Sequence, residues 1–328
     1  MSAGAGLTRR RVLRIGGAVL ATAAWAPNLR ATPWGPRSPV VFALPAGACD
    51  CHVHIVADPA RFAMAADRIY TPPQASPDML LELQRDLHLA RVVLVQPSFY
   101  GADNGALLDA MKQLGPQRAR GVAVVGEAGS DADLNAMAKA GIRGVRINLE
   151  TAGELDPAVA ARKLQAAIAQ CRPRGWHIQL YTRPSVIAAL REILADSPVP
   201  LVFDHFAGAQ AAQGLAQPGF DAVLALVRSG KAYVKISAAY RASKAPAPYD
   251  DAAPFARALV AANPDRVIWG SDWPHTDSTR VPGRAPTEVS PFLQVDDGVM
   301  LNQLPRWVPE TALRRKILTE NPARLYGF

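Results

Sequence analysis

Short apolar runs alternate with longer amphipathic segments from about residue 48 to the C-terminus. The runs are compact and rich in β-branched residues, which is typical of buried strands. Each is bounded by turn residues or by a segment of helical periodicity. The pattern predicts eight strands, at Ala48–Val56, Arg91–Gln96, Gly121–Gly126, Gly144–Leu149, His177–Tyr181, Leu201–Phe206, Ala232–Ser237 and Arg266–Gly270.

The segments between the strands carry apolar side chains three or four positions apart, with Asp or Ser near several starts and Gly after several ends, which predicts helices. Parallel strands require crossover helices, and eight strand–helix units close a sheet into a TIM barrel. An open doubly wound sheet would carry a Gly-x-Gly-x-x-Gly turn after an early strand, and none lies there. We therefore predict an α/β fold, a single-domain (β/α)8 TIM barrel over residues 47–328. The clearest predicted helices are Asp78–Leu89, Ala106–Leu114, Pro157–Gln170, Ser185–Ala195, Phe220–Ser229 and Ala252–Ala262.

The N-terminus has a different character. Thr8-Arg9-Arg10-Arg11-Val12-Leu13-Arg14 precedes about a dozen apolar or small residues, too few to span a bilayer. It resembles a twin-arginine (Tat) export signal, Ser/Thr-Arg-Arg-x-hydrophobic-Leu-Lys/Arg. We expect residues 1–31 to be a cleavable signal, with cleavage after Ala26 or Ala31, and residues 32–46 to be a Pro-rich connector. The mature protein would be periplasmic or extracellular, without a stable membrane anchor.

Net charge adds little to this picture. The formal charge is +8 and the pI about 9.7, but four arginines lie in the acid-free N-terminus, and without them the charge is +4. The remainder shows no basic stripe with interleaved aromatic residues, so we expect no nucleic-acid partner. Three cysteines are too few for a disulfide scaffold. The sequence does not predict the oligomeric state.

Ionisable residues concentrate where the predicted strands end. In a TIM barrel the loops at these carboxyl ends build the active site. Isolated buried charges are costly, so this concentration indicates catalysis rather than packing. Four of the six histidines lie at these ends, whereas His88 and His177 lie away from them and are expected to be structural. The residues concerned are His52, His54, Gln96-Pro97-Ser98, Arg146, Asn148, Tyr181, Asp204-His205, Ser237, Arg241 and Asp272 to His275.

The alternation of side chains along the first predicted strand indicates where its two histidines point. Successive side chains of a strand point to opposite faces, so His52 and His54 share a face and are expected to point into the barrel mouth. Cys49 and Cys51 would then face the helices as packing residues. A disulfide between them would be strained, because they stand two positions apart on a strand.

The ordered motifs of residues 47–328 resemble the amidohydrolase superfamily, and within it the group of 2-pyrone-4,6-dicarboxylate lactonase. The motifs are "DCHVHI", "RVVLVQPSFYGADN", "GIRGVRINL", "VFDHF", "VKIS", "GSDWPH" and "ILTENPARLYGF". The resemblance implies hydrolysis of a ring ester. Asp272 would take a proton from the attacking water, while His52, His54 and His205 stabilise the oxyanion.

Fuller metal sites of this superfamily add a lysine or glutamate from strand 4 and a histidine from strand 5. This sequence has Arg146 and Tyr181 there, which argues against a binuclear site. One divalent ion, such as zinc, could still be held by His52, His54, His205 and Asp272. The lactonase group is known for working without metal, with its histidines acting on the carbonyl directly, and the resemblance therefore favours that metal-free route.

The resemblance also supplies residues that hold substrate carboxylates. Two further arginines of that pattern are replaced here by Ala152 and Gly208, so the substrate, a small lactone or ring acid, is expected to be less anionic than the pyrone dicarboxylate. Thr276 to Pro291, rich in proline, is expected to be a loop near the site. The substrate-binding residues implied are Tyr70, Ser98, Arg146, Tyr181, Arg241 and His275.

Other functions stay open. Decarboxylases and a sugar-lactone isomerase of the same superfamily use similar groups at the barrel mouth. An exported organic-acid binding protein without turnover is a third alternative, although a binder needs no general base.

Overall fold

The computed structural model describes residues 1–2, 38–126 and 129–328. Contacts divide the chain into Met1–Thr32 and Pro33–Phe328. Residues 3–31 of the predicted signal and residues 32–37 of the predicted connector lie outside the described residues. The strands and helices of the barrel all belong to the second unit.

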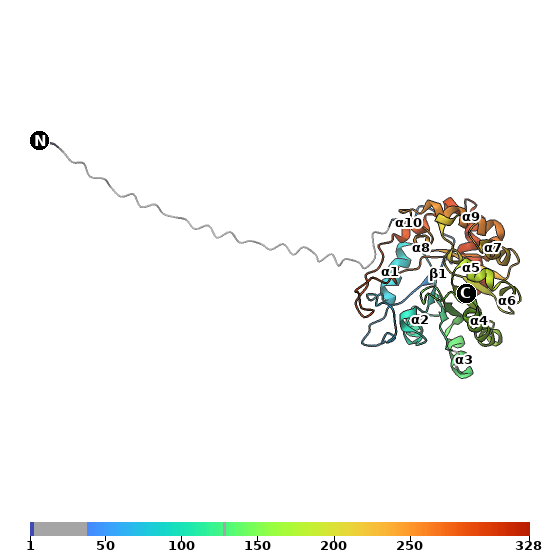
Figure 1. Cartoon of the computed structure of the whole chain (residues 1–328). Helices are drawn as coiled ribbons and strands as arrows, with labels where there is room; N and C mark the ends of the chain where they lie inside the picture. The colour runs from blue at the N-terminus through green and yellow to red at the C-terminus, as the bar shows by residue number, and fades with distance from the viewer. Residues whose placement is uncertain (3–37, 127–128) are drawn as a thin grey trace. The chain divides into compact units, whose positions relative to one another are not determined.

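Eight parallel strands form one sheet in which each strand pairs with the next along the chain. Figure 1 shows the helices placed around the central β1. The predicted (β/α)8 barrel is confirmed, with strand ends displaced from the predicted ones by at most three residues. The strands are β1 (Cys49–Val53), β2 (Arg91–Val95), β3 (Ala119–Ala123), β4 (Ile142–Asn148), β5 (His177–Tyr181), β6 (Leu201–Phe203), β7 (Ala232–Ser237) and β8 (Val267–Gly270).

Helices surround the sheet. The six predicted helices are confirmed, although the fourth of them is broken at Leu190 into α5 and α6. Helix α3 is not among the clearest predicted helices, because it fully buries only Leu134, with Met137 and Ala138 partly buried, and its apolar stripe is short. No helix among the described residues is both long and apolar enough to span a membrane. The helices are α1 (Pro77–Asp86), α2 (Gly105–Leu114), α3 (Asp131–Ala140), α4 (Pro157–Cys171), α5 (Pro184–Ala189), α6 (Arg191–Ala195), α7 (Phe220–Arg228), α8 (Ala239–Ala242), α9 (Ala253–Ala262), α10 (Asp297–Leu301), α11 (Leu304–Trp307), α12 (Thr311–Arg315) and α13 (Asn321–Tyr326).

The barrel closes between β1 and the residues that follow β8. Backbone hydrogen bonds join Asp272 N to His52 O and His54 N to Trp273 O, both at 2.8 Å. Asp50 contributes its side chain, because its Oδ1 accepts from Ser271 N at 2.9 Å. Gly270 allows this close approach, since a Cβ there would lie 2.8 Å from the His52 backbone nitrogen. This seam places Asp272 directly beside the two histidines of β1.

The alternation predicted for β1 is wrong at its first residues. The pairing of β1 with β2 shifts register between Asp50 and Val53, which marks a bulge or similar irregularity. Cys49 and Cys51 cluster with Val93, Val122 and other strand residues, together with Tyr326 of α13, and separately from the larger core cluster that holds Val53 and most helix residues. Such an irregularity lets the cysteines and the two histidines occupy the same side of the strand. All three cysteines are buried and free, as packing residues should be.

The other two histidines lie away from the barrel mouth, as predicted. His177 is buried at the start of β5, and its ring lies edge-on to that of Tyr326 in α13, with centroids 5.2 Å apart. Burial lowers the pKa of His177 to about 3, so its imidazole is neutral. His88 follows α1 and is exposed. The predicted loop at 276–291 contains no helix or strand.

Candidate active site

Four side chains converge at the carboxyl ends of the strands. Asp272 Oδ1 lies 3.5 Å from His52 Nε2, 3.4 Å from His54 Nε2 and 3.7 Å from His205 Nε2. The Nε2 atoms of His52 and His54 are 3.3 Å apart. All four residues are buried. The structure therefore brings together the four residues that the sequence predicted as one cluster.

The two carboxylate oxygens of Asp272 have different surroundings. Oδ2 accepts hydrogen bonds from Tyr240 OH at 2.7 Å and Arg241 Nε at 2.6 Å. Oδ1 is buried without a hydrogen-bond partner among the described residues and faces the three imidazoles. Burial alone would raise the pKa of Asp272, but Arg241 and the histidines hold it well below its usual value. Asp272 is therefore an ionised carboxylate with one oxygen free to act.

Backbone conformation supports the placement of two of these groups. Asp272 has a φ of 69° and His205 one of 49°, both left-handed. Such conformations cost non-glycine residues about 1–3 kcal/mol each, and in proteins they cluster at functional sites.

The second nitrogen of each imidazole is also held. His54 Nδ1 lies 2.7 Å from the carbonyl oxygen of Val95, which can only accept, so Nδ1 carries a proton. His205 Nδ1 lies 2.9 Å from Ser237 Oγ. Burial lowers the pKa of His205 to about 4, which keeps this ring neutral at ordinary pH. Fixed orientations of this kind are what oxyanion stabilisation or metal ligation requires.

Below the histidines lies a buried polar layer centred on Lys235, a residue to which the sequence patterns gave no role. Lys235 Nζ lies 2.7 Å from Gln179 Oε1 and 3.2 Å from Asp204 Oδ1. Gln179 Nε2 and Arg146 Nε approach Asp204 Oδ2 at 3.0 and 3.4 Å. Burial raises the pKa of Asp204, but Lys235 and His52 lower it by more than burial raises it. The pKa of Asp204 therefore lies well below its usual value. The sequence could have indicated this position: in "VKIS", Lys235 and Ser237 stand two positions apart, so their side chains lie on the same side of β7.

The donor set can hold one divalent ion. His52, His54 and Asp272 offer ligand atoms close enough to share an ion, and a second such group is His52, Asp204 and His205. Ligand atoms about 2.0–2.2 Å from a tetrahedral zinc ion stand roughly 3.4 Å apart, close to the distances between Asp272 Oδ1 and the three imidazoles. The unpartnered, ionised Oδ1 is the kind of atom that a cation would satisfy.

A cavity of about 20 Å³ lies directly at the site, close to the room that a single water needs. Five of the predicted substrate-binding residues line it: Tyr70, Ser98, Arg146, Tyr181 and Arg241. His275 does not. It is fully buried behind Tyr240, with Nε2 3.1 Å from Asp297 Oδ1 and Nδ1 3.2 Å from Tyr240 OH.

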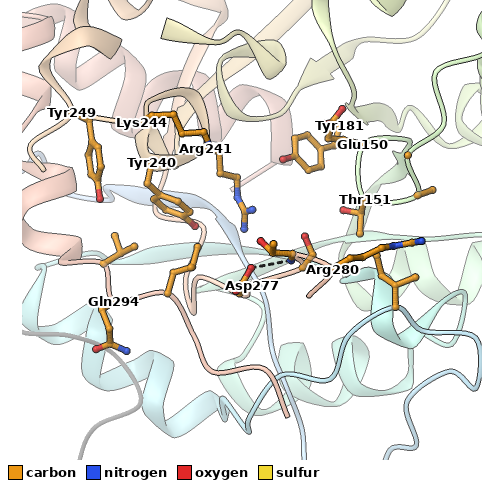
Figure 2. Close-up of a pocket in the computed structure, with 17 residues that line it drawn as sticks. Glu150, Thr151, Tyr181, Tyr240, Arg241, Lys244, Tyr249, Asp277, Arg280 and Gln294 are labelled. Carbon is orange, nitrogen blue, oxygen red and sulfur yellow. Dashed lines mark hydrogen bonds between the residues drawn. The ribbon is translucent and has the colours of Figure 1, made fainter. Parts of the chain in front are cut away.

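A larger cavity of about 940 Å³, here called the outer chamber, shares Thr151, Tyr181, Arg241 and Ser278 with the small one. Figure 2 shows Arg241 on its wall, between Tyr240 and Tyr181. Lys244 and Arg280 also line it, and neither forms an ion pair with a described residue. Of these two spaces, only the outer chamber can admit a ring compound.

The fold and the site define a hydrolase family. The family model for Amidohydrolase matches residues 49–328, and the chain belongs to that family.

Particular relatives are closely similar. The chain is 35% identical over 302 residues to 4-sulfomuconolactone hydrolase of Rhizobium radiobacter, which covers 89% of this chain and 95% of the relative. It is also 35% identical over 296 residues to 2-pyrone-4,6-dicarboxylate hydrolase of Comamonas testosteroni, covering 87% and 92%. A solved structure from Pseudomonas putida, which bears the name of a 2-pyrone-4,6-dicarboxylic acid hydrolase, aligns with a TM-score of 0.71 at 32% identity, covering 87% and 98%.

Proposed function

We propose that this protein hydrolyses the lactone ring of a small organic or sugar acid. The observation that carries the proposal is the free Oδ1 of Asp272, ionised, buried and facing three imidazole nitrogens beside a water-sized cavity. The family and the two hydrolases named above, both of which act on ring esters by name, support the same reaction class.

The chemistry follows from the positions of these groups. Asp272 Oδ1 accepts a proton from water as the water oxygen attacks the lactone carbonyl. The imidazoles of His52, His54 and His205 surround the same point. His52 and His205 can donate to the oxyanion that develops, whereas His54, with its proton on Nδ1, orients His52. The ring C–O bond then breaks, and the proton held by Asp272 passes to the leaving oxygen. Arg241 and Tyr240 keep Oδ2 in place, so Oδ1 stays aimed at the water.

Two forms of carbonyl activation fit the donor set. A neutral imidazole with its proton on Nε2 donates to the oxyanion directly. Alternatively, a divalent ion held by His52, His54, His205 and Asp272 would polarise the carbonyl as a Lewis acid.

Substrate size and charge follow from the two cavities. Arg146 and Arg241 already face Asp204 and Asp272, so their guanidinium groups are partly neutralised. At Gly208 a Cβ would lie 2.2 Å from the carbonyl oxygen of Thr182, so this backbone accepts no arginine there. We infer that the substrate ring lies in the outer chamber, with its lactone carbonyl directed toward the small cavity and Asp272. Lys244 and Arg280 then meet a distal anionic group in that chamber.

Replacing Lys244 or Arg280 with Ala should therefore raise KM about fivefold for a lactone with a distal carboxylate, the effect of an exposed ion pair of about 1 kcal/mol. KM for an uncharged lactone of equal size should change much less. Lys112→Ala, an exposed lysine at the end of α2, is the matched control. Equal KM changes for charged and uncharged lactones would contradict the assignment of the chamber.

The reaction class is tested by incubating the purified protein with a panel of lactones and following proton release. Hydrolysis gives one carboxylic acid for each ring opened and no carbon dioxide. A decarboxylase would release carbon dioxide, an isomerase would move the ring without net acid, and a binding protein would bind without turnover. Any of these three results would replace the proposed reaction.

We also propose export by the Tat pathway, supported by the sequence pattern of residues 8–26 alone, which lies outside the described residues. In a host with that pathway, a double Arg9→Lys and Arg10→Lys variant should remain in the cytoplasmic fraction while the unmodified chain reaches the periplasm. Equal fractionation of both would contradict this proposal.

A further inference from the structure

The side chain of Lys235 is fully buried inside the barrel, and the proposed reaction does not use it. Its side chain is 0% exposed. Burial of an ammonium group is costly unless it is paired, so a lysine kept here calls for a role. Its Nζ contacts Gln179 Oε1 and Asp204 Oδ1, and it lies 3.2 Å from Nδ1 of His52.

His52 Nδ1 thus has two competing neighbours. The ammonium of Lys235 can only donate to it, whereas Asp204 Oδ1, also 3.2 Å away, can only accept from it. If Nδ1 accepts from Lys235, the neutral ring carries its proton on Nε2. If Nδ1 instead donates to Asp204, Nε2 is a bare lone pair. The two arrangements present opposite chemistry to the reaction centre.

The surrounding hydrogen bonds favour the first arrangement. His54 has its proton on Nδ1, donated to Val95 O, so its Nε2 accepts. That Nε2 lies 3.3 Å from Nε2 of His52, which then donates. A continuous chain results, from Lys235 Nζ through His52 and His54 to the Val95 carbonyl, with a donor and an acceptor at each contact. Asp204 does not depend on His52, because its Oδ2 is held by Gln179 and Arg146.

We propose that Lys235 is a positioning residue that holds the His52 proton on Nε2, while Asp204 stabilises the opposite tautomer. This N–H points to His54 Nε2 when no substrate is bound, is shared with the substrate carbonyl when one enters, and opposes binding of a divalent ion. A metal-bound imidazole must present a lone pair and commonly donates its other nitrogen to a carboxylate. The balance between Lys235 and Asp204 therefore sets whether the site activates the carbonyl through histidine or through an ion. The inference rests on the proposed function only in placing His52 at the reacting carbonyl.

The first test measures zinc binding without any lactone. Zinc affinity, determined by competition with a chelating indicator, should be about tenfold or more higher for Lys235→Met than for the unmodified protein. For Asp204→Asn it should be about 10–100-fold lower, as for other partners of metal-bound histidines. Lys231→Met, which changes an exposed lysine next to β7, is the control and should bind zinc as the unmodified protein does. Equal or weaker zinc binding by a folded Lys235→Met variant would overturn the proposal.

The deciding result of the second test comes from the unmodified protein and does not depend on the folding of a variant at position 235. In metal-free protein with ¹⁵N-labelled histidine, long-range ¹H–¹⁵N spectra distinguish protonated from unprotonated ring nitrogens, and the His52 signals are those lost in His52→Gln. The unmodified protein should show Nε2 protonated and Nδ1 unprotonated, and Lys235→Met should show the reverse. A protonated Nδ1 in the unmodified protein would refute the role of Lys235. Because neither test uses a lactone, the absence of lactone turnover would count against the proposed function and leave this inference standing.

Discussion

Asp272→Asn is expected to lower kcat/KM for lactone opening by about 10²–10⁴-fold, the range that a positioned general base contributes. The amide can keep its oxygen at the Oδ2 position, where Tyr240 and Arg241 donate. Its NH₂ group then replaces Oδ1 and cannot take a proton from water. The fold should persist, because the hydrogen bonds at Oδ2 are retained.

The rate loss is measured by initial-rate assays, with thermal unfolding as the check on folding. The matched control is Asp297→Asn, a buried carboxylate near the site that contacts His275 and lines neither cavity. It should lower kcat/KM less than tenfold. A rate close to normal in Asp272→Asn would remove Asp272 as the base.

Arg241→Met is expected to have the largest effect on stability. It leaves the Asp272 carboxylate without the guanidinium that lies 2.6 Å away, and breaking a buried pair costs about 3–5 kcal/mol. The Arg241 side chain is 20% exposed, so we expect about 3 kcal/mol, the lower end of that range. Urea denaturation at neutral pH measures this loss.

The same variant should change the pH dependence. In the unmodified protein the pKa of Asp272 lies well below its usual value, so this carboxylate adds stability above the unfolded-state pKa and loses it only as pH falls through the lower folded pKa. Without Arg241 the folded pKa rises, so the stability gap should narrow as the pH falls through the variant's pKa. The acid limb of kcat/KM should move to higher pH. An unchanged acid limb would show that another group controls it, and Arg241→Lys, which keeps the charge, should restore part of both effects.

Much of the fold and the central cluster could be predicted because both depend on local patterns. Apolar runs rich in β-branched residues identify strands by themselves. Because the active site of a TIM barrel lies at the carboxyl ends of its strands, His52, His54, His205 and Asp272 are then expected to lie together. The irregularity in β1 could not be predicted in this way, since it is a mismatch of register with β2 that no property of "DCHVHI" records. Cys49 and Cys51 were therefore placed on the wrong side.

Two further residues show the limit of motif matching. Lys235 looks like a single charge interrupting an apolar strand, and only the closed barrel brings β7 close to β1, with Lys235 Nζ 3.2 Å from His52 Nδ1. His275 follows Asp272 closely in sequence, but its left-handed φ of 65° turns it toward Asp297 and away from the cavities. Its assignment as a substrate-binding residue stays a prediction, and its observed contacts indicate support of Tyr240.

The most direct test of hydrolysis at Asp272 is lactone turnover in H₂¹⁸O with product analysis by mass spectrometry. The mechanism predicts one ¹⁸O atom in the new carboxylate of every product molecule, with incorporation lost together with turnover in Asp272→Asn. Product formed without ¹⁸O, or labelled product formed at the normal rate by Asp272→Asn, would contradict water attack with Asp272 as the base.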